Sequence, residues 1–240
     1  MSFCLEWKKG KKTGFLPAFL GGGLLAAAVP VMNMAVRSAI YTGLDSSPMK
    51  ILFDGNWQMM AMLNILLIVM GACILYHTEY VDNAIQRMCT LPIRESTLFW
   101  GKFGVITVTS IVVLAMEALA MVFCVAHWFE LTPGLGIELL KCFGYACLLM
   151  LPTISCSLLA ASLCKNMWVS LGIGVVCVFT ATLLPTDNFL LSLFPFALPF
   201  QMFEGTAKTM IYQYVIATVV EVLIIAFAES ALLKVRRSME

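Results

Sequence analysis

Six long apolar runs do most to constrain what this chain of 240 residues can fold into. A helix needs roughly 20 apolar residues to cross the hydrocarbon core of a bilayer. Only 12% of the residues are charged, whereas a soluble domain carries about a quarter. We therefore predict an all-α, polytopic membrane protein whose six transmembrane helices lie near Phe15–Val36, Trp57–His77, Phe103–Ala126, Cys142–Leu163, Met167–Leu184 and Met210–Leu233.

Six spans leave little chain for a water-soluble domain, so we expect one membrane domain over residues 1–240. The first apolar run continues past its Ala26-Ala27-Ala28 stretch to Val36, which is typical of an anchor that stays and not of a cleaved signal peptide. Lys and Arg concentrate in cytoplasmic segments of membrane proteins. With the N-terminus inside, 11 of these residues fall on inner segments and 4 on outer ones. This count predicts that both termini are cytoplasmic.

Two segments outside the spans are predicted to be short helices. Residues 2–13 combine Phe3, Leu5 and Trp7 with four lysines, which favours an interfacial helix at the headgroups; a disordered basic tail is the alternative. The segment Pro185–Lys208 is apolar but contains closely spaced prolines, which prevent one continuous helix. It fits an apolar hairpin of two short helices dipping into the outer leaflet, and an amphipathic surface loop fits equally well.

Small residues form stripes on two of the predicted spans. Gly22 and Gly23 lie four residues before Ala26 and Ala27, and Gly172 and Gly174 form a weaker stripe with Ser170. Such stripes let helix backbones approach closely. The pattern fits packing within one subunit as well as contact with another.

The segment between the second and third spans is the most charged part of the chain. Val81, Ala84, Ile85 and Met88 recur at helical spacing. Polar residues occupy the other face, namely Glu79, Asp82, Asn83, Gln86 and Arg87. This pattern predicts an amphipathic helix lying at the cytoplasmic surface, either as a docking surface for a soluble partner or as a solvated face. The sequence Leu91-Pro92 ends it.

This segment resembles the first cytoplasmic loop of ABC type-2 transporter permeases. The similarity rests on Glu79-x-x-x-Asn83, on the run Thr90-Leu91-Pro92-Ile93-Arg94, and on Leu98 and Lys102. The layout of six spans, interfacial helix and apolar hairpin extends the resemblance over the whole chain. It is closest to small permeases of bacterial lantibiotic-immunity and bacitracin-type exporters. The chain departs from the commonest pattern at Arg94-Glu95, where many members have Ser-Arg or Lys-Arg.

The resemblance implies a non-catalytic permease subunit of an ATP-driven exporter in the bacterial cytoplasmic membrane, expelling antimicrobial peptides. The charged segment would be a coupling helix seated on a separate ATPase subunit, present in two copies that bind ATP and Mg. A second permease chain, identical or homologous, would complete the pathway. The chain itself has no GxxxxGK[ST] phosphate loop. The implied coupling residues are Glu79, Asp82, Asn83, Gln86, Arg87, Leu91, Pro92 and Arg94.

Two carboxyl groups, Glu117 and Glu221, fall midway along the third and sixth spans. A carboxylate at membrane depth is costly, so it normally faces a cavity or a partner. These residues fit either a transport path or helix packing through a hydrogen bond to Asn33 or Asn64. Glu229, nearer the inner surface, is expected to be solvated.

No cofactor, metal site or nucleic-acid partner is indicated. The nine cysteines are scattered without a CxxC pair, and the predicted topology puts His77 and His127 at opposite membrane faces. Two other functions stay open: export of another hydrophobic drug or a lipid, and proton-coupled secondary transport through Glu117 and Glu221. The second usually brings internal repeats, which this sequence lacks. An intramembrane enzyme would need catalytic groups clustered at one depth, and the spans show no such cluster.

Overall fold

The computed structural model describes residues 2–81, 95–130, 134–164, 166–184 and 188–239. Over these residues every regular element is a helix. The elements in chain order are α1 (Ser2–Lys12), α2 (Phe15–Tyr41), α3 (Pro48–Val81), α5 (Glu95–Trp128), α6 (Leu135–Leu163), α7 (Met167–Leu183), α8 (Phe189–Ser192), η1 (Leu198–Phe200) and α9 (Lys208–Met239).

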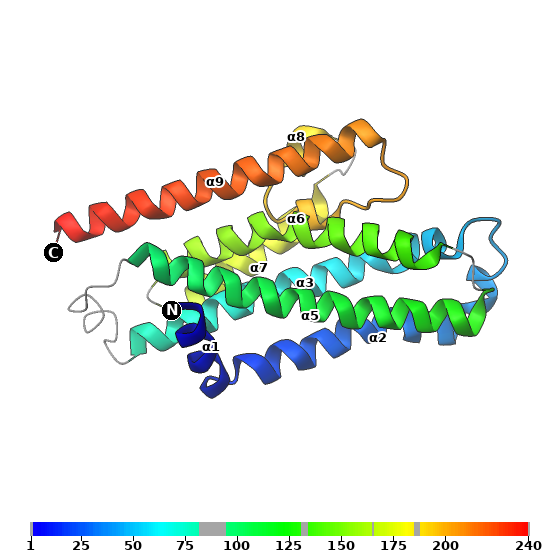
Figure 1. Ribbon diagram of the computed structural model, residues 1–240, viewed down its shortest axis with the longest axis horizontal. Helices are drawn as coiled ribbons and strands as arrows, with labels where there is room; N and C mark the ends of the chain where they lie inside the picture. The colour runs from blue at the N-terminus through cyan, green and yellow to red at the C-terminus, as the bar shows by residue number, and fades with distance from the viewer. Residues whose placement is uncertain (1, 82–94, 131–133, 165, 185–187, 240) are drawn as a thin grey trace.

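The six long helices lie side by side along the long axis of the molecule (Figure 1). Both chain termini lie at the same end of this bundle, which we call the terminal end. The short helix α1 lies across the terminal end, whereas η1 and α8 pack near the other half of the bundle. The predicted all-α, polytopic architecture is confirmed.

Five helices, α2, α3, α5, α6 and α9, are long and apolar enough to cross a membrane, and α7 is a shorter apolar helix of 17 residues. Each predicted span is therefore a helix, but several helices continue beyond the apolar run. The helix α3 begins at Pro48 instead of Trp57 because its first turns are amphipathic: Met49 and Leu52 are buried, while Lys50 is exposed.

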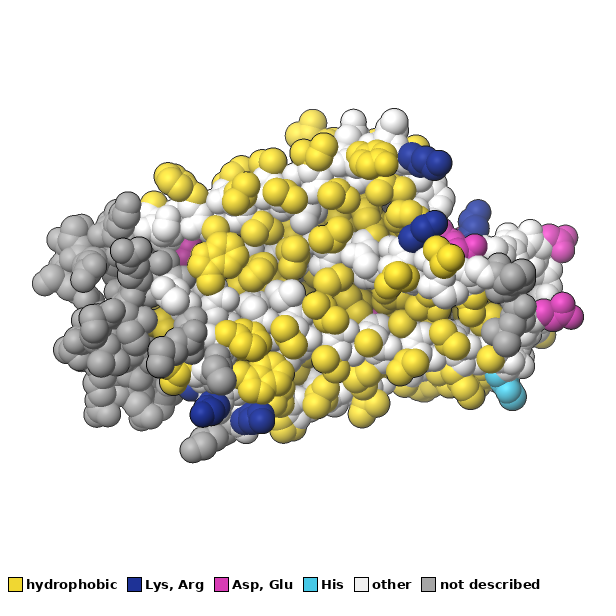
Figure 2. Space-filling model, viewed as in Figure 1, with side chains coloured by type: hydrophobic (Ala, Val, Ile, Leu, Met, Phe, Trp, Pro, Cys, Tyr) yellow, Lys and Arg dark blue, Asp and Glu magenta, His cyan; other side chains and the backbone are white. Residues whose placement is uncertain are grey.

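The core lies around α3, which packs against α2, α5, α6, α7 and η1 and is the most buried long helix. The helix α9 is the most exposed and contacts mainly α6. Apolar side chains cover the middle of the surface in Figure 2, and the coloured charged groups gather toward its ends. Such a distribution suits a lipid-facing surface, since charge at membrane depth is costly.

The small-residue stripes pack inside the subunit. A Cβ on Gly23 would lie 2.6 Å from Val113 Cγ2, and a Cβ on Gly22 would overlap Leu67. Gly174 is closed off in the same way by Val69. These contacts join α2 to α3 and α5, and α7 to α3, at close range. Packing within the subunit thus accounts for Gly22, Gly23 and Gly174, whereas a Cβ on Gly172 would meet open space.

The segment before α9 contains two short helices, α8 and η1, as the hairpin prediction required. Phe196, Ala197 and Leu198 are buried against the bundle, whereas Leu190 and Leu191 of α8 are exposed. The indole nitrogen of Trp57 donates a 3.1 Å hydrogen bond to the carbonyl oxygen of Pro199, and the Thr153 hydroxyl donates to that of Pro195. The prolines keep this segment from forming a continuous helix, so these carbonyl oxygens have no helical N–H partner. The side chains of Trp57 and Thr153 supply the missing hydrogen-bond donors.

The N-terminal segment is also helical, which excludes the alternative of a disordered tail. Between α1 and α2 the chain turns at Gly14, whose φ of 74° lies in the left-handed region that glycine adopts readily. This turn sets α1 against the ends of α2 and α5.

Candidate functional site

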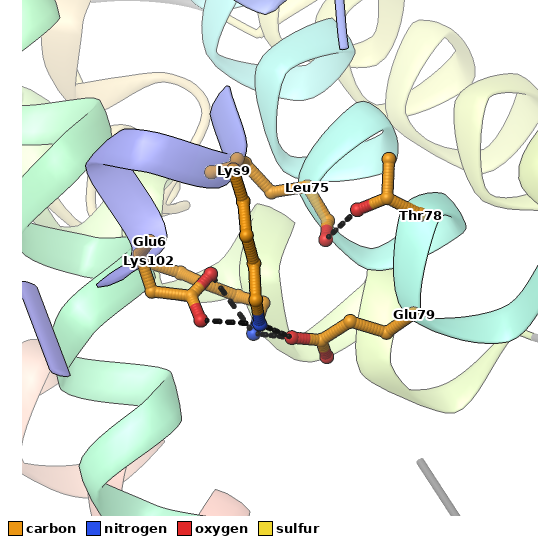
Figure 3. Close-up of polar contacts among 6 residues, drawn as sticks. All are labelled: Glu6, Lys9, Leu75, Thr78, Glu79 and Lys102. Carbon is orange, nitrogen blue, oxygen red and sulfur yellow. Dashed lines mark hydrogen bonds and ion pairs between the residues drawn. The ribbon is translucent and has the colours of Figure 1, made fainter. Parts of the chain in front are cut away.

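Four charged side chains meet at the terminal end of the bundle, where α1, α3 and α5 come together. We call them the charge cluster: Glu6 and Lys9 from α1, Glu79 from the last turn of α3, and Lys102 from the start of α5. Figure 3 shows their side chains converging from three directions. Two of the four charges are positive and two are negative, so the cluster is neutral overall.

Lys102 and Glu79 form the central pair. The Nζ atom of Lys102 lies 2.6 Å from Glu79 Oε1 and 3.6 Å from Glu6 Oε2. The Nζ atom of Lys9 lies 2.9 Å from Glu6 Oε1 and 3.3 Å from Glu79 Oε1. Each ammonium therefore contacts both carboxylates, and each carboxylate contacts both ammonium groups.

The cluster is withdrawn from solvent. Lys102 is 0% exposed, Glu6 1% and Glu79 5%, while only Lys9 reaches the surface. Burial by itself lowers the pKa of Lys9, but the hydrogen bonds and negative charges of Glu6 and Glu79 outweigh it and raise that pKa. Removing one partner of a buried ion pair is strongly destabilising, because it leaves an uncompensated charge. The four groups are therefore mutually dependent.

Local sequence features explain how α1 reaches this position. Glu6 and Lys9 are three residues apart, so they lie on neighbouring positions of one helix surface. A Cβ on Gly104 would lie 3.1 Å from the ring of Phe3, so the missing side chain lets α1 sit closely on α5. Close packing at Gly104 holds Glu6 and Lys9 of α1 next to Lys102, which lies two residues before Gly104 on α5.

Polar contacts continue from the cluster to α6 and α9. The Lys102 ammonium lies 4.9 Å from the ring centroid of Tyr76, a cation–π contact. One turn further along α3, the Tyr80 hydroxyl donates to the Ser162 carbonyl oxygen at 2.6 Å. The Ser162 hydroxyl donates to Glu229 Oε2 at 3.0 Å.

The sequence predicted a solvated Glu229, and this prediction is wrong: the residue is only 3% exposed. The sequence could not predict this burial, because Glu229 lies near the end of α9 and is covered only where α6 packs against that turn. The contact ties α9, the least buried of the long helices, to the rest of the terminal end.

The predicted coupling residues are placed only in part. Glu79 is buried in the charge cluster, so its carboxylate is directed to Lys102 and Lys9 and not to the surface. The others lie outside the described residues, namely Asp82, Asn83, Gln86, Arg87, Leu91, Pro92 and Arg94. The described helices α3 and α5 flank this segment directly, ending at Val81 and beginning at Glu95.

The two mid-span carboxyl groups have different surroundings. Glu117 is 0% exposed, and its Oε2 accepts a 3.1 Å hydrogen bond from Asn64 Nδ2 on α3. Asn33 instead bonds Tyr41 and Asn56. Glu221 is half-buried on α9, and one of its oxygens is buried without a hydrogen-bond partner among the described residues. Among the described residues, no hydrogen bond or ion pair joins Glu117 to Glu221.

Reasoning from sequence identified Glu79 and Lys102 but missed Glu6 and Lys9. The four lysines of residues 2–13 were predicted to lie near lipid headgroups, and no role was predicted for Glu6, which lies among them. The available signal was that Glu6 is the single acidic residue among residues 2–13. Within the described parts of the chain no group of three or more His, Cys, Asp or Glu side chains could hold a metal ion.

Comparison with known proteins adds one result. A family model described as ABC-2 family transporter protein matches residues 3–181, which include all four residues of the charge cluster. No curated protein and no solved structure matches the chain significantly.

Proposed function

The chain belongs to the ABC-2 transporter family and is a membrane permease subunit of an ABC transporter, and from this premise we propose that it exports antimicrobial peptides with energy from a separate ATPase. The proposed partners are two ATPase subunits, which bind ATP and Mg, and a second permease chain, identical or homologous. The observation that carries the coupling part of this proposal is the charge cluster on both sides of residues 82–94.

The cluster joins the two helices that flank that segment. Glu79 lies two residues before the end of α3, and Lys102 lies two turns into α5. Their 2.6 Å ion pair holds the helices from which the segment leaves and to which it returns. Because α3 and α5 are held together in this way, a movement of the docked ATPase would be passed on to the spans and would not be lost where the segment joins these helices.

Within this proposal the residues have two roles. Asp82, Asn83, Gln86, Arg87, Leu91, Pro92 and Arg94 form the surface that contacts the ATPase. Glu79 acts differently from the docking residue that the sequence suggested. It is a positioning residue, because its carboxylate is engaged by Lys102 and Lys9.

The peptide substrate is supported by the resemblance to lantibiotic-immunity permeases and by the apolar character of the surface. Cationic peptides of this kind seek membranes, so their removal suits an apolar pathway opening near the hairpin of α8 and η1. Glu117 and Glu221 are the acidic groups available along the spans to attract or orient a cationic peptide, and helix packing is their other role.

Photo-crosslinking tests the docking surface. A benzoylphenylalanine placed at Gln86 should crosslink to an ATPase chain in membranes of cells that make the protein. Gln58 is the matched control, because it is an exposed glutamine of α3 far from the segment. A crosslink to an ATPase from position 58 but not from position 86 would contradict the proposal.

Substrate class is tested separately by exposing cells to cationic antimicrobial peptides. Cells that produce the complex should survive a higher peptide concentration than cells that lack this chain. Equal sensitivity, with the ATPase crosslink intact, would remove the peptide part of the proposal and leave the transporter assignment standing.

A further inference from the structure

We propose that α1 carries a binding site for anionic phospholipid headgroups, formed by the exposed lysines Lys8 and Lys11 on a helix that the charge cluster holds in place. This site goes beyond the transport function, because it needs neither an ATPase nor a transported substrate.

The lysines of α1 are divided between two tasks. Lys9 turns inward and pairs with Glu6 and Glu79. Lys8 and Lys11 are exposed, and no acidic side chain of the described part of the chain lies within ion-pair distance of either. Within the described residues, their charges are therefore not neutralised by an internal carboxylate. The sequence shows four similar lysines, and only the packing of α1 identifies Lys9 as the one that turns inward.

The position of α1 along the bundle matches the headgroup region. Its last residue, Lys12, is separated from Phe15, the first residue of the apolar helix α2, by a two-residue turn. Tryptophan is enriched at membrane–water interfaces. Trp7 lies on α1 itself, while Trp100 on α5 and Trp168 on α7 are exposed at the same end of the bundle. These rings place the boundary of the hydrocarbon at the level of α1.

Apolar side chains next to the lysines favour a lipid over a soluble partner. Phe3 is 42% exposed and Leu5 52% exposed, and the ring of Phe3 stacks on Trp7 at 6.0 Å between centroids. A phospholipid offers both a phosphate for the lysines and an acyl boundary for these side chains. An acidic protein surface in water would satisfy the lysines and leave the apolar side chains exposed.

The charge cluster makes the site rigid before binding. Glu6 is buried and bonded to Lys9, and Lys102 lies 3.6 Å from it. The helix therefore does not need to order itself when a lipid arrives, and a preorganised site avoids that entropic cost. Figure 3 shows Glu6 and Lys9 leaving α1 toward the cluster, so the helix is anchored through that surface.

The test uses the full chain alone, without nucleotide or ATPase, in phosphatidylcholine vesicles. Electron paramagnetic resonance of spin-labelled phosphatidylglycerol and phosphatidylcholine gives the relative affinity of the chain for the two lipids. The double variant Lys8→Gln/Lys11→Gln should lower the preference for phosphatidylglycerol, by about fivefold for each lysine if each acts independently near an anionic surface. The preference of the unchanged chain should fall with rising salt.

The matched control is Lys141→Gln/Lys208→Gln, which removes two exposed lysines from the other end of the bundle. It should keep most of the preference, and Lys8→Arg/Lys11→Arg should keep it as well. Thermal denaturation of each variant establishes that it is folded. An equal loss in the control would reduce the effect to general charge and overturn the site.

Two further results would also overturn it. The first is an unchanged lipid preference in a folded Lys8→Gln/Lys11→Gln variant. The second is an unchanged lipid preference together with weaker ATPase binding, which would make this face of α1 a protein-docking surface. The lipid measurement uses the chain alone, so its outcome does not bear on the peptide or ATPase parts of the proposed function. ATPase binding is measured separately on the assembled complex.

Discussion

Lys102 is the residue on which the terminal end of the bundle most depends. Its side chain has no exposed surface, and its charge is compensated by carboxylates from two other helices. The ring of Tyr76 supplies a further favourable contact. A buried ammonium without these partners would be forced to lose its proton or draw in water.

Replacing Lys102 with Met keeps the apolar stem but removes the charge. Two buried carboxylates then share the single partner Lys9, so we expect a loss of about 3–5 kcal/mol in the free energy of unfolding. Denaturant titration of the purified chain measures it. Lys141→Met, an exposed lysine near the start of α6, should stay within about 0.5 kcal/mol.

A double-mutant cycle of Glu79→Gln and Lys102→Met measures the coupling within the central pair. Because each single variant leaves one charge of this pair without its nearest partner, the double variant should lose less free energy of unfolding than the two single variants summed. If the losses simply add, the two side chains do not interact as the 2.6 Å distance indicates.

Glu117 and Glu221 allow packing and transport roles to be separated. Glu117→Gln keeps an oxygen that can accept from Asn64, so the complex should assemble normally. Glu117→Ala leaves the buried Asn64 amide unpaired, at about 1–3 kcal/mol, and should reduce assembly. If the carboxyls attract a cationic peptide, Gln at either position should weaken peptide resistance in a complex that still assembles. Normal assembly and resistance in both Ala variants would exclude both roles.

At the scale of elements, the glycines Gly22 and Gly23 let the middle of α2 approach α3 and α5 closely. Gly23→Ala places a Cβ 2.6 Å from Val113 Cγ2, and the β-branched valine has little rotamer freedom to move away. We expect about 1–3 kcal/mol of destabilisation from overpacking, measured by denaturant titration. Gly21→Ala has open space and should be neutral or slightly stabilising. Equal stability of the two variants would contradict the close approach of α2 to α5.

The elements were predictable from sequence, and the site only in part. Each apolar run became a helix, because a run of that length has no other way to satisfy its backbone in lipid. The polar first turns of α3 were missed, since Lys50 and Asn56 interrupt the apolar pattern. Glu79 and Lys102 were visible through a resemblance, but Glu6 joined them only through the packing of α1 on Gly104. Contacts between helices far apart in the chain produce no periodic pattern in the sequence, so they cannot be predicted from it.

For the whole molecule, the placement of both termini at one end predicts the membrane topology together with the charge count. In a chain whose native cysteines are replaced, a Cys at position 46 or 187 should react with an impermeant reagent added outside the cell. A Cys at position 94 or 238 should not react. The reverse labelling pattern would invert the orientation, although the fold would be unaffected.

The same end of the molecule joins the spans through polar contacts. The charge cluster links α1, α3 and α5, and the contacts of Tyr80, Ser162 and Glu229 extend the connection to α6 and α9. Among the described helices, this end therefore connects α3 and α5, the helices that flank residues 82–94, to α1, α6 and α9.

ATP hydrolysis by the assembled complex, with and without substrate, tests most directly whether that segment couples the two subunits. Ile85→Pro should break its predicted helix and abolish both substrate-stimulated hydrolysis and transport, while the chain still inserts in the membrane. Ile85→Ala, which preserves helix propensity, should retain both activities. Full ATPase binding and undiminished substrate-stimulated hydrolysis in Ile85→Pro would contradict the coupling role of residues 82–94.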